Sequence, residues 1–296
     1  MKKMLLVFNP KSGVQKFIAQ LFDVADMFTA AGFLVTVYPT QAPGEAGNII
    51  TQYAGGYDYI VCSGGDGTIG EAIGALLPLD NHPVFGLIPS GTVNDFASSL
   101  GIPRDIMTAA SIIIEGVVRP LDIGCFGKKH FSYVAAFGLF TDVAYATPQN
   151  IKNMLGNLAY FFEGVKRIGQ VKSYRCKLTL DGEVIKGDFI LGIVTNAHRI
   201  GGVKLPEEIG VEMDDGLFEV ILLQTPESIK DRQGFIASLL NQDFNSDLLT
   251  IRKVREVGFV STEPVAWTLD GDYGGEFIEV TLRNHHKALE IILPPD

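Results

Sequence analysis

The stretch VCSGGDGTIGEA, residues 61–72, joins an apolar, strand-like run to a segment that is compatible with a helix. Between the two lie Gly64, Gly65 and Gly67, with the carboxylate of Asp66 among them. Glycines let backbone N–H groups approach a ligand closely, and a helix that starts there favours an anion such as phosphate. An aspartate among those amides suits a divalent cation or a proton. The other interpretation of this stretch is an ordinary tight turn.

The first 120 residues alternate short apolar runs with amphipathic segments. Strands are expected at residues 4–8, 33–38, 58–62 and 84–88. Helices are expected at residues 17–31, 46–53, 69–77, 95–100 and 106–115. This order predicts an α/β domain with a mostly parallel sheet that is covered by helices on both faces. Ligands of such sheets bind beyond the carboxyl ends of the strands.

Three of these expected strands end in polar loops that contain glycine. The loops are NPKSG at residues 9–13, GGDGT at residues 64–68 and PSGTVND at residues 89–95. Each loop alone is weak evidence, because Asn-Pro and Ser-Gly are common in loops and Thr92, Asn94 and Asp95 are also typical helix caps. Parallel strands bring the three loops to one edge of the sheet. This coincidence predicts a site for a phosphate-bearing ligand.

After Pro120 the sequence becomes rich in strand-like segments, with Asp-Gly hairpin turns expected at residues 181–182 and 270–271. Two helical stretches, at about residues 150–169 and 227–241, interrupt the strands. We therefore expect an α/β domain at residues 1–122 and an antiparallel, sandwich-like or barrel-like domain at residues 123–286. The last segment, about residues 287–296, either pairs within the second domain or returns to the first. His285 and His286 are expected in a solvated turn.

Composition and charge exclude several classes of protein. The formal net charge is −10 and the pI is about 5.0, which argues against nucleic acid as a partner, because phosphates require a basic surface. The cysteines at positions 62, 125 and 176 form no C-x-x-C pair, which is typical of a reducing compartment. No stretch approaches the ~20 apolar residues of a membrane span. We expect a cytoplasmic protein.

Six sequence blocks occur in a specific order: NPKSG, GGDGTIGEA, IPSGTVNDFA, LDIG, DDGLFEV and LDGD. Together they resemble the bacterial diacylglycerol kinase family, soluble lipid kinases related to the eukaryotic diacylglycerol and sphingosine kinases. GGDGT is shared with NAD kinases, but this sequence lacks a second glycine-rich block of the NAD kinase kind. The resemblance implies a nucleotide-binding α/β domain, a β-rich domain that binds lipid and metal, and a cleft between them for ATP and lipid.

The resemblance also implies which residues bind the nucleotide. Contacts to ATP are implied for Asn9, Pro10, Lys11, Thr40 and Thr92. A phosphate cradle is implied for Gly64, Gly65, Asp66, Gly67, Thr68 and Glu71, with Asn94 and Asp95 shaping the same pocket. Asp66 is further expected to hold the catalytic Mg²⁺, either directly or through water.

Two acidic blocks in the second half complete the implied chemistry. In DDGLFEV a structural Mg²⁺ site is implied, with the Asp215 carboxylate and the backbone carbonyls of Glu212 and Leu217 as ligands; the alternative is an Asp-Gly turn that opens a strand. In LDGD the catalytic base is expected to be Asp272, although many relatives have glutamate there, so the carboxylate arm is one methylene shorter. Asp270 either assists or simply fills the turn. Asp122, in LDIG, is expected at the junction of the domains rather than in a metal network.

The expected reaction is ATP- and Mg²⁺-dependent phosphorylation of diacylglycerol to phosphatidic acid. One alternative is a kinase of the same fold that acts on a sphingoid base, phosphatidylglycerol or a polyprenol. A second is a nucleotide-binding sensor without catalysis. The lipid is expected to be met at a membrane surface through transient peripheral contact. A homodimer is also among the expectations, because β-rich domains with an exposed strand edge often pair.

Overall fold

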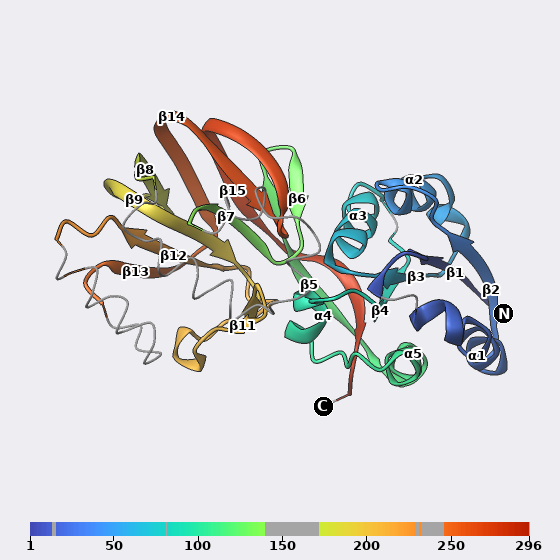
Figure 1. The fold of residues 1–296 in the computed structure, drawn as a ribbon. Coiled ribbons are helices and arrows are strands. Elements are labelled where there is room, and N and C mark those ends of the chain that lie inside the picture. Colours follow the sequence, from blue (N-terminus) through green and yellow to red (C-terminus); the bar gives the residue numbers. More distant parts are fainter. Residues whose placement is uncertain (14–15, 81, 140–171, 229–230, 232–245, 296) are drawn as a thin grey trace. The chain divides into compact units, whose positions relative to one another are not determined.

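The computed structural model describes residues 1–13, 16–80, 82–139, 172–228, 231 and 246–295. They fall into two compact units, which Figure 1 shows as a ribbon. Unit 1 comprises Met1–Ile123 and His286–Asp296, and unit 2 comprises Gly124–His285. The C-terminal segment therefore lies with the first unit. The helices expected at residues 150–169, and nearly all of the one expected at residues 227–241, fall outside the described residues.

The sheet of unit 1 is built from parallel pairs. Its strands are β1 Lys2–Phe8, β2 Phe33–Pro39, β3 Tyr59–Gly64, β4 Val84–Pro89 and the end of β15 Asp272–Leu293. The order is β15-β4-β3-β1-β2, and every neighbouring pair within unit 1 is parallel. The last five residues of both β3 and β4 are buried, as expected for strands that are covered on both faces.

Helices lie on both faces of this sheet. They are α1 Lys16–Ala30, α2 Glu45–Tyr53, α3 Asp66–Leu76, α4 Asp95–Ser99 and α5 Ile106–Glu115, with a short 3₁₀ turn at Ala54–Gly56. Helix α1 packs against α5 on one face, and α2 packs against α3 on the other (Figure 1). In the part of the chain that the structure describes, no helix combines the length and apolar character needed to cross a membrane.

Unit 2 is built from antiparallel strands. They are β6 Lys129–Phe131, β7 Val134–Gly138, β8 Tyr174–Leu180, β9 Glu183–Thr195, β12 Phe218–Gln224, β13 Leu249–Val254 and β14 Glu256–Leu269, together with parts of β5 Val117–Phe126 and β15. A hairpin of β10 Arg199–Ile200 and β11 Val203–Lys204 precedes a 3₁₀ turn at Glu207–Ile209. Strands β7 and β8 each pair with both β9 and β14, along different parts of these two longer strands.

A single aromatic core shows how this sheet is shaped. Trp267 is fully buried and its ring lies 5.1 Å from that of Phe126 and 4.9 Å from that of Phe137. Phe131 of β6 stacks on Phe218 of β12 at 5.5 Å, although β6 and β12 lie near opposite ends of the order of pairing. The sheet therefore curls around one core. This agrees with the expected antiparallel, sandwich-like or barrel-like domain.

Both predicted Asp-Gly turns are confirmed. Asp181 and Asp270 have positive φ angles of 47° and 52°, and each precedes a glycine that also has positive φ. In each hairpin the residue before the aspartate pairs with the residue after the glycine, so that two residues form the loop. Asp and Gly tolerate this backbone conformation better than other residues, which is why the pair marks such hairpins.

Strands β5 and β15 were only partly foreseen. The segment that begins at Val117 was not predicted as a strand, and the turn expected at His285 and His286 is wrong, because β15 is continuous through both residues. The fully buried carboxylate of Asp122 explains this: it accepts a hydrogen bond from the Lys287 amide at 2.7 Å and lies 3.0 Å from His286 Nδ1. The contact holds β15 beside β5.

The core of unit 2 leaves no room for a side chain at Gly192. This residue of β9 pairs with Phe137 of β7, and a Cβ atom there would lie 2.1 Å from Phe137 Cε1. We expect Gly192→Ala to lower the free energy of unfolding by about 1–3 kcal/mol, because the aromatic ring must shift in a packed core. Urea unfolding of the two proteins measures the difference. Gly258→Ala in β14 is the matched control, since its Cβ would meet Thr179 Cβ at an ordinary 3.4 Å. Equal stability of the two variants would contradict the expectation.

Candidate functional site

The loops that follow the strands of unit 1 lie side by side at the carboxyl edge of the sheet. After β1, the Asn9 amide donates a hydrogen bond to the Ser63 carbonyl of β3 at 2.9 Å. After β2, the Thr40 amide donates to the Phe8 carbonyl at 2.9 Å. Strand β4 pairs with β3 up to the last residue of both strands. The three glycine-bearing loops therefore meet, as the parallel order predicted.

Glycines let these loops pack directly on one another. A Cβ atom at Gly91 would lie 2.4 Å from Gly65 Cα, so the second and third loops touch through their backbones. Gly13 has a positive φ of 43°, and a Cβ atom there would lie 1.9 Å from the Ser90 carbonyl oxygen. Gly13 and Gly91 thus lack side chains because the loops pack closely on one another. The predicted reason was a different one, namely that phosphate can approach the backbone. The approach of phosphate to the backbone stays a prediction.

Asp66 connects the second loop to the third. It is the first residue of α3, and its two carboxylate oxygens accept hydrogen bonds from the Asp95 amide at 3.2 Å and the Phe96 amide at 3.1 Å. These amides begin α4. Burial raises the pKa of Asp66 above its usual range, although the backbone N–H groups oppose that rise. The carboxylate therefore has a structural role that the sequence did not indicate.

The third loop is closed by its own side chains. The Asn94 side chain both accepts from the Gly91 amide and donates to the Gly91 carbonyl, each at 2.9 Å. Asn94 occupies the left-handed region with φ 55°, so it precedes α4 without capping it by its side chain. Arg104 donates to the Val93 carbonyl and holds the loop from outside. Thr92 is exposed, which leaves its hydroxyl accessible at this edge.

The loop after β1 is joined to the start of α3 by a side-chain contact. Asn9 Nδ2 donates to Thr68 Oγ1 at 3.3 Å, and Asn9 Oδ1 accepts from the Lys11 amide at 2.9 Å. Pro10 is half-buried, whereas Lys11 is exposed. The three predicted nucleotide contacts of this loop are thus brought next to the predicted phosphate cradle. Their binding role stays a prediction.

Two glutamates shape the loop between β2 and α2. Glu71 of α3 accepts a hydrogen bond from the Gly44 amide at 2.8 Å, and Glu45 of α2 accepts one from the Ala42 amide at 3.1 Å. Thr40 is buried behind this loop. Glu71, predicted in the phosphate cradle, is therefore engaged with a backbone amide. The role of Glu45 was not predicted from the sequence. The pattern that indicates it is an acidic residue in the first turn of a helix.

The chemistry of Asp66 is compatible with a hydrated Mg²⁺. A carboxylate has about four lone-pair directions, and the two described hydrogen bonds use one on each oxygen. Mg²⁺ usually keeps several waters and takes one or two protein carboxylates together with substrate phosphates. Among the described residues, no group of three or more His, Cys, Asp or Glu side chains is arranged to hold a metal.

In unit 2 the LDGD block presents one exposed carboxylate and holds another. Asp272 is exposed at the first position of β15, directly opposite Leu269. The Asp270 carboxylate accepts hydrogen bonds from the amides of Ser132, Tyr133 and Val134 at 2.6, 3.0 and 3.1 Å. Burial raises the pKa of Asp270 to about 6 in spite of these donors. Asp270 thus anchors the turn, and the role of the exposed Asp272 as a base stays a prediction.

In the DDGLFEV block, Asp215 and Leu217 of the predicted metal site contact each other, and Asp215 also lies near Lys253. Asp215 Oδ1 accepts from the Leu217 amide at 2.8 Å, while Asp215 Oδ2 lies 3.5 Å from Lys253 Nζ. Glu212 is exposed. Burial raises the pKa of Glu219 to about 7, although the Lys253 ammonium opposes the rise. Sequence reasoning missed Glu219 and Lys253, because their pairing requires the register of β12 with β13.

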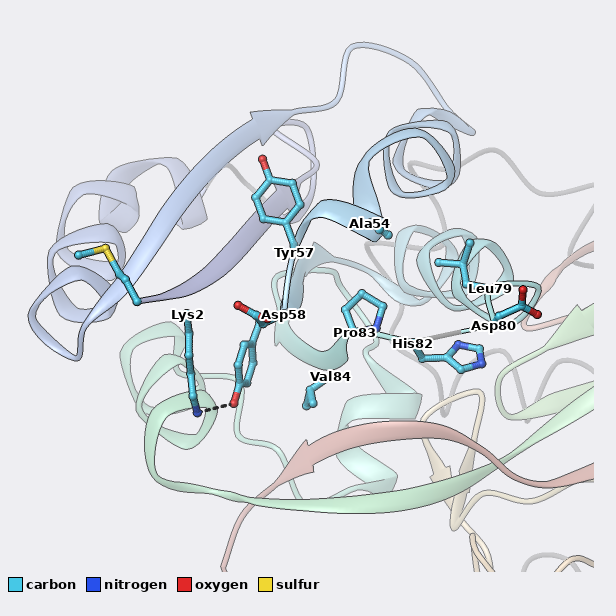
Figure 2. A pocket seen from close by; sticks show the side chains of 12 residues that line it. Lys2, Ala54, Tyr57, Asp58, Leu79, Asp80, His82, Pro83 and Val84 are labelled. Atoms are coloured by element: carbon cyan, nitrogen blue, oxygen red, sulfur yellow. Dashed lines mark hydrogen bonds between the residues drawn. The ribbon is translucent and has the colours of Figure 1, made fainter.

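A cavity of about 740 Å³ lies at the other edge of the unit 1 sheet. Figure 2 shows its lining, which includes Lys2, Asp58 and Val84 near the starts of β1, β3 and β4. The Lys2 ammonium donates to the Tyr59 hydroxyl at 2.8 Å on this side. Since parallel strands place their amino ends opposite their carboxyl ends, the cavity lies away from the glycine-bearing loops and is not part of the candidate site.

The close approach of the second and third loops makes a first prediction for the site. Gly91→Ala would bring its Cβ to 2.4 Å from Gly65 Cα and 2.8 Å from Asn94 Oδ1. We expect the variant to lower the free energy of unfolding by about 1–3 kcal/mol, because backbone atoms must separate. Urea unfolding measures this. Gly55→Ala is the control, as no atom lies within 4 Å of the added Cβ. A Gly91→Ala variant as stable as the control would be evidence against the packed arrangement.

The Asp270 anchor predicts a pH dependence of stability. Its folded pKa of about 6 lies above that of an unfolded aspartate, about 3.9, so the unfolded chain binds fewer protons between these values. Stability from this group is therefore present below pH ~4 and is lost as the pH rises to about 6. Asp270→Asn removes the titration, so the stability of the wild type relative to this variant should fall across that window in thermal unfolding.

Asp181→Asn is the matched control for this measurement. Asp181 occupies the other Asp-Gly turn, and its carboxylate accepts from the amides of Arg255 and Glu256, each at 2.9 Å. Asp181→Asn retains Asp270, so its stability should fall across the same pH window as that of the wild type. If wild type and Asp270→Asn show the same pH profile, the raised pKa of Asp270 is wrong.

Comparison with known proteins agrees with the geometry of both units. Residues 3–126 match the family model described as "Diacylglycerol kinase catalytic domain". The chain is 33% identical to the diacylglycerol kinase of Bacillus subtilis (strain 168) over 303 residues, covering all of this chain and 98% of that protein. It is 31% identical to the diacylglycerol kinase of Staphylococcus saprophyticus, covering all of this chain and 96% of that protein. A crystal structure of a diacylglycerol kinase from Bacillus anthracis str. Sterne matches with a TM-score of 0.84 at 26% identity, over 99% of this chain and 97% of that one. The chain therefore belongs to the bacterial diacylglycerol kinase family of lipid kinases.

Proposed function

We propose that this protein transfers the γ-phosphoryl group of ATP to the hydroxyl of 1,2-diacylglycerol in a Mg²⁺-dependent reaction that yields phosphatidic acid and ADP. The observation that carries the proposal is the meeting of three glycine-bearing loops at the carboxyl ends of β1, β3 and β4, beside the start of α3. The names of the full-length relatives support diacylglycerol as the acceptor.

Unit 1 offers the groups that bind a triphosphate. Helix α3 begins at Asp66, and its free N–H groups and positive dipole end favour phosphate oxygens. Lys11 is exposed in the loop after β1 and supplies an ammonium group, and Thr68 supplies a hydroxyl that Asn9 holds at 3.3 Å. The residues proposed to form the nucleotide site are those that the family resemblance implies: Asn9, Pro10, Lys11, Thr40, Gly64, Gly65, Asp66, Gly67, Thr68, Glu71, Thr92, Asn94 and Asp95.

Some of these residues act through others. Glu71 holds the Gly44 amide and Asn94 holds both backbone groups of Gly91, so each fixes a loop. We assign them as positioning residues. Mg²⁺ near Asp66 would neutralise charge on the phosphates, which is the main requirement of phosphoryl transfer. The Asp66 carboxylate orients the start of α4 whether or not Mg²⁺ is bound.

Asp272 is assigned as the general base. As the lipid hydroxyl oxygen forms its bond to the γ-phosphorus, the hydroxyl proton passes to the Asp272 carboxylate. The bond between the γ-phosphorus and the bridging oxygen breaks, and ADP leaves with those electrons. Asp270 is a positioning residue, because its three backbone hydrogen bonds hold the turn that presents Asp272. We propose that the lipid is met at a membrane surface through peripheral contact.

The test is transfer of labelled γ-phosphate from ATP to a panel of lipid alcohols in mixed micelles. We expect Mg²⁺-dependent labelling of diacylglycerol. Asp66→Ala should abolish it, and Asp272→Asn should lower kcat by about 10²–10⁴-fold, the usual contribution of a general base. Asp272→Glu should retain activity because it keeps the carboxylate. Glu276→Gln, an exposed change on the same strand, should have no effect and serves as the control.

Other results would redirect the proposal. Labelling of a sphingoid base, phosphatidylglycerol or a polyprenol in place of diacylglycerol would keep the mechanism and replace the acceptor. ATP binding without labelling of any lipid would indicate a nucleotide sensor. Full activity of Asp272→Asn would remove Asp272 from the role of base.

A further inference from the structure

The corner formed by residues 210–219 contains a carboxylate that lacks a hydrogen-bond partner among the described residues. Glu219 of β12 is fully buried, and neither of its side-chain oxygens accepts a hydrogen bond there. A buried carboxylate is very unfavourable unless a positive charge compensates it. A second carboxylate, Asp215, is largely buried at the same corner. Either a nearby cation or a bound proton must therefore offset the charge.

Lys253 of β13 supplies that cation from within the protein. It is directly opposite Glu219 in the antiparallel register, so both side chains lie on the same face. Lys253 Nζ lies 3.4 Å from Glu219 Oε1 and 3.5 Å from Asp215 Oδ2, and it donates a hydrogen bond to the Gly210 carbonyl. The three oxygen partners of the ammonium group are thus two carboxylates and a backbone carbonyl.

Two of the three ligands that the family resemblance implies for a metal, Asp215 and Leu217, are engaged in other contacts. The Leu217 carbonyl accepts a hydrogen bond from Asn284 Nδ2 at 2.9 Å, and the Leu217 amide donates to Asp215 Oδ1 at 2.8 Å. Asp215 Oδ2 faces the ammonium. A divalent ion bound at Asp215 would be repelled by the adjacent Lys253 charge. The donor set present at this corner therefore does not fit Mg²⁺.

We propose that Lys253 is the built-in cation of this corner, and that its ammonium group compensates Glu219 and Asp215 so that residues 210–219 keep their conformation without a divalent ion. The loop that precedes β12 is then held by an ion pair across β12 and β13. This proposal is independent of the nucleotide, the lipid and the reaction, so its test uses the protein without substrates.

The experiment is thermal unfolding of the full-length, nucleotide-free protein in EDTA and in millimolar Mg²⁺. We expect the Tm of the wild type to agree within about 1 °C in the two buffers, because a cation bound only to the folded state would raise it. Lys253→Met keeps the aliphatic stem and removes the charge, and should lower the Tm by about 5 °C, because the fully buried Glu219 carboxylate loses the ammonium group of the exposed Lys253.

Two further variants keep the test decisive. Glu219→Gln combined with Lys253→Met removes both charges and should recover most of the lost Tm, also if Lys253→Met alone does not fold. Arg252→Met is the matched control: Arg252 is the preceding residue, and its contact with Glu183 at 3.6 Å is exposed. It should change the Tm by no more than about 2 °C, because surface ion pairs contribute little.

Two results would overturn the proposal. One is a Mg²⁺-induced rise in the wild-type Tm that Asp215→Asn abolishes, which would place a divalent ion at this corner. The other is a loss of Tm in Lys253→Met no larger than that in Arg252→Met, which would show that the ammonium group does not compensate Glu219.

Discussion

The hydrogen bonds from the amides of Asp95 and Phe96 to Asp66 are the contacts on which the candidate nucleotide site depends. They tie the loop after β3 to the loop after β4, and they are possible because Gly65 and Gly91 bring the two backbones into contact. A phosphate-binding edge must be rigid before the ligand arrives, since ordering loops on binding reduces affinity. Asp66 supplies that rigidity at the start of α3, where an anion is also favoured.

The same device recurs in unit 2. The Asp270 carboxylate binds three consecutive amides, and the Asp181 carboxylate binds the amides of Arg255 and Glu256. In both cases an aspartate that begins a hairpin turn anchors that turn to a neighbouring segment. Carboxylates that are held in this way are poorly suited to proton transfer. Asp272, which is exposed beside the anchored Asp270, is the carboxylate of its block that retains freedom to react.

Because of these contacts, the acidic composition does not by itself describe the surface charge of the protein. A net charge of −10 suggests a negative surface, but several carboxylates are buried against backbone amides, as Asp122 is against Lys287. Glu219 differs from them, because no amide reaches it among the described residues and an ammonium group lies opposite. The buried carboxylates of Asp122 and Glu219 are thus compensated by a backbone amide in one case and by a cation in the other. Both arrangements couple segments that are distant in the sequence.

The sequence alone determined the features that depend on neighbouring residues. Apolar runs separated by helical segments predicted the first four strands of unit 1, and Asp-Gly pairs predicted both hairpin turns, because backbone φ preferences are local. The loops NPKSG, GGDGT and PSGTVND were recognised as a group for the same reason. Their meeting at one edge followed from the parallel order.

Only the tertiary structure decided the partners of the charged groups. Asp66 bonds to amides 29 and 30 residues away, and Glu219 meets Lys253 through the register of two strands, so no local pattern reports either contact. The continuity of β15 through His285 and His286 also depends on a distant residue, the buried Asp122. A sequence shows which residues carry charge. The pairing of strands decides which backbone groups and counter-ions those charges meet, because burial and distance set electrostatic energies.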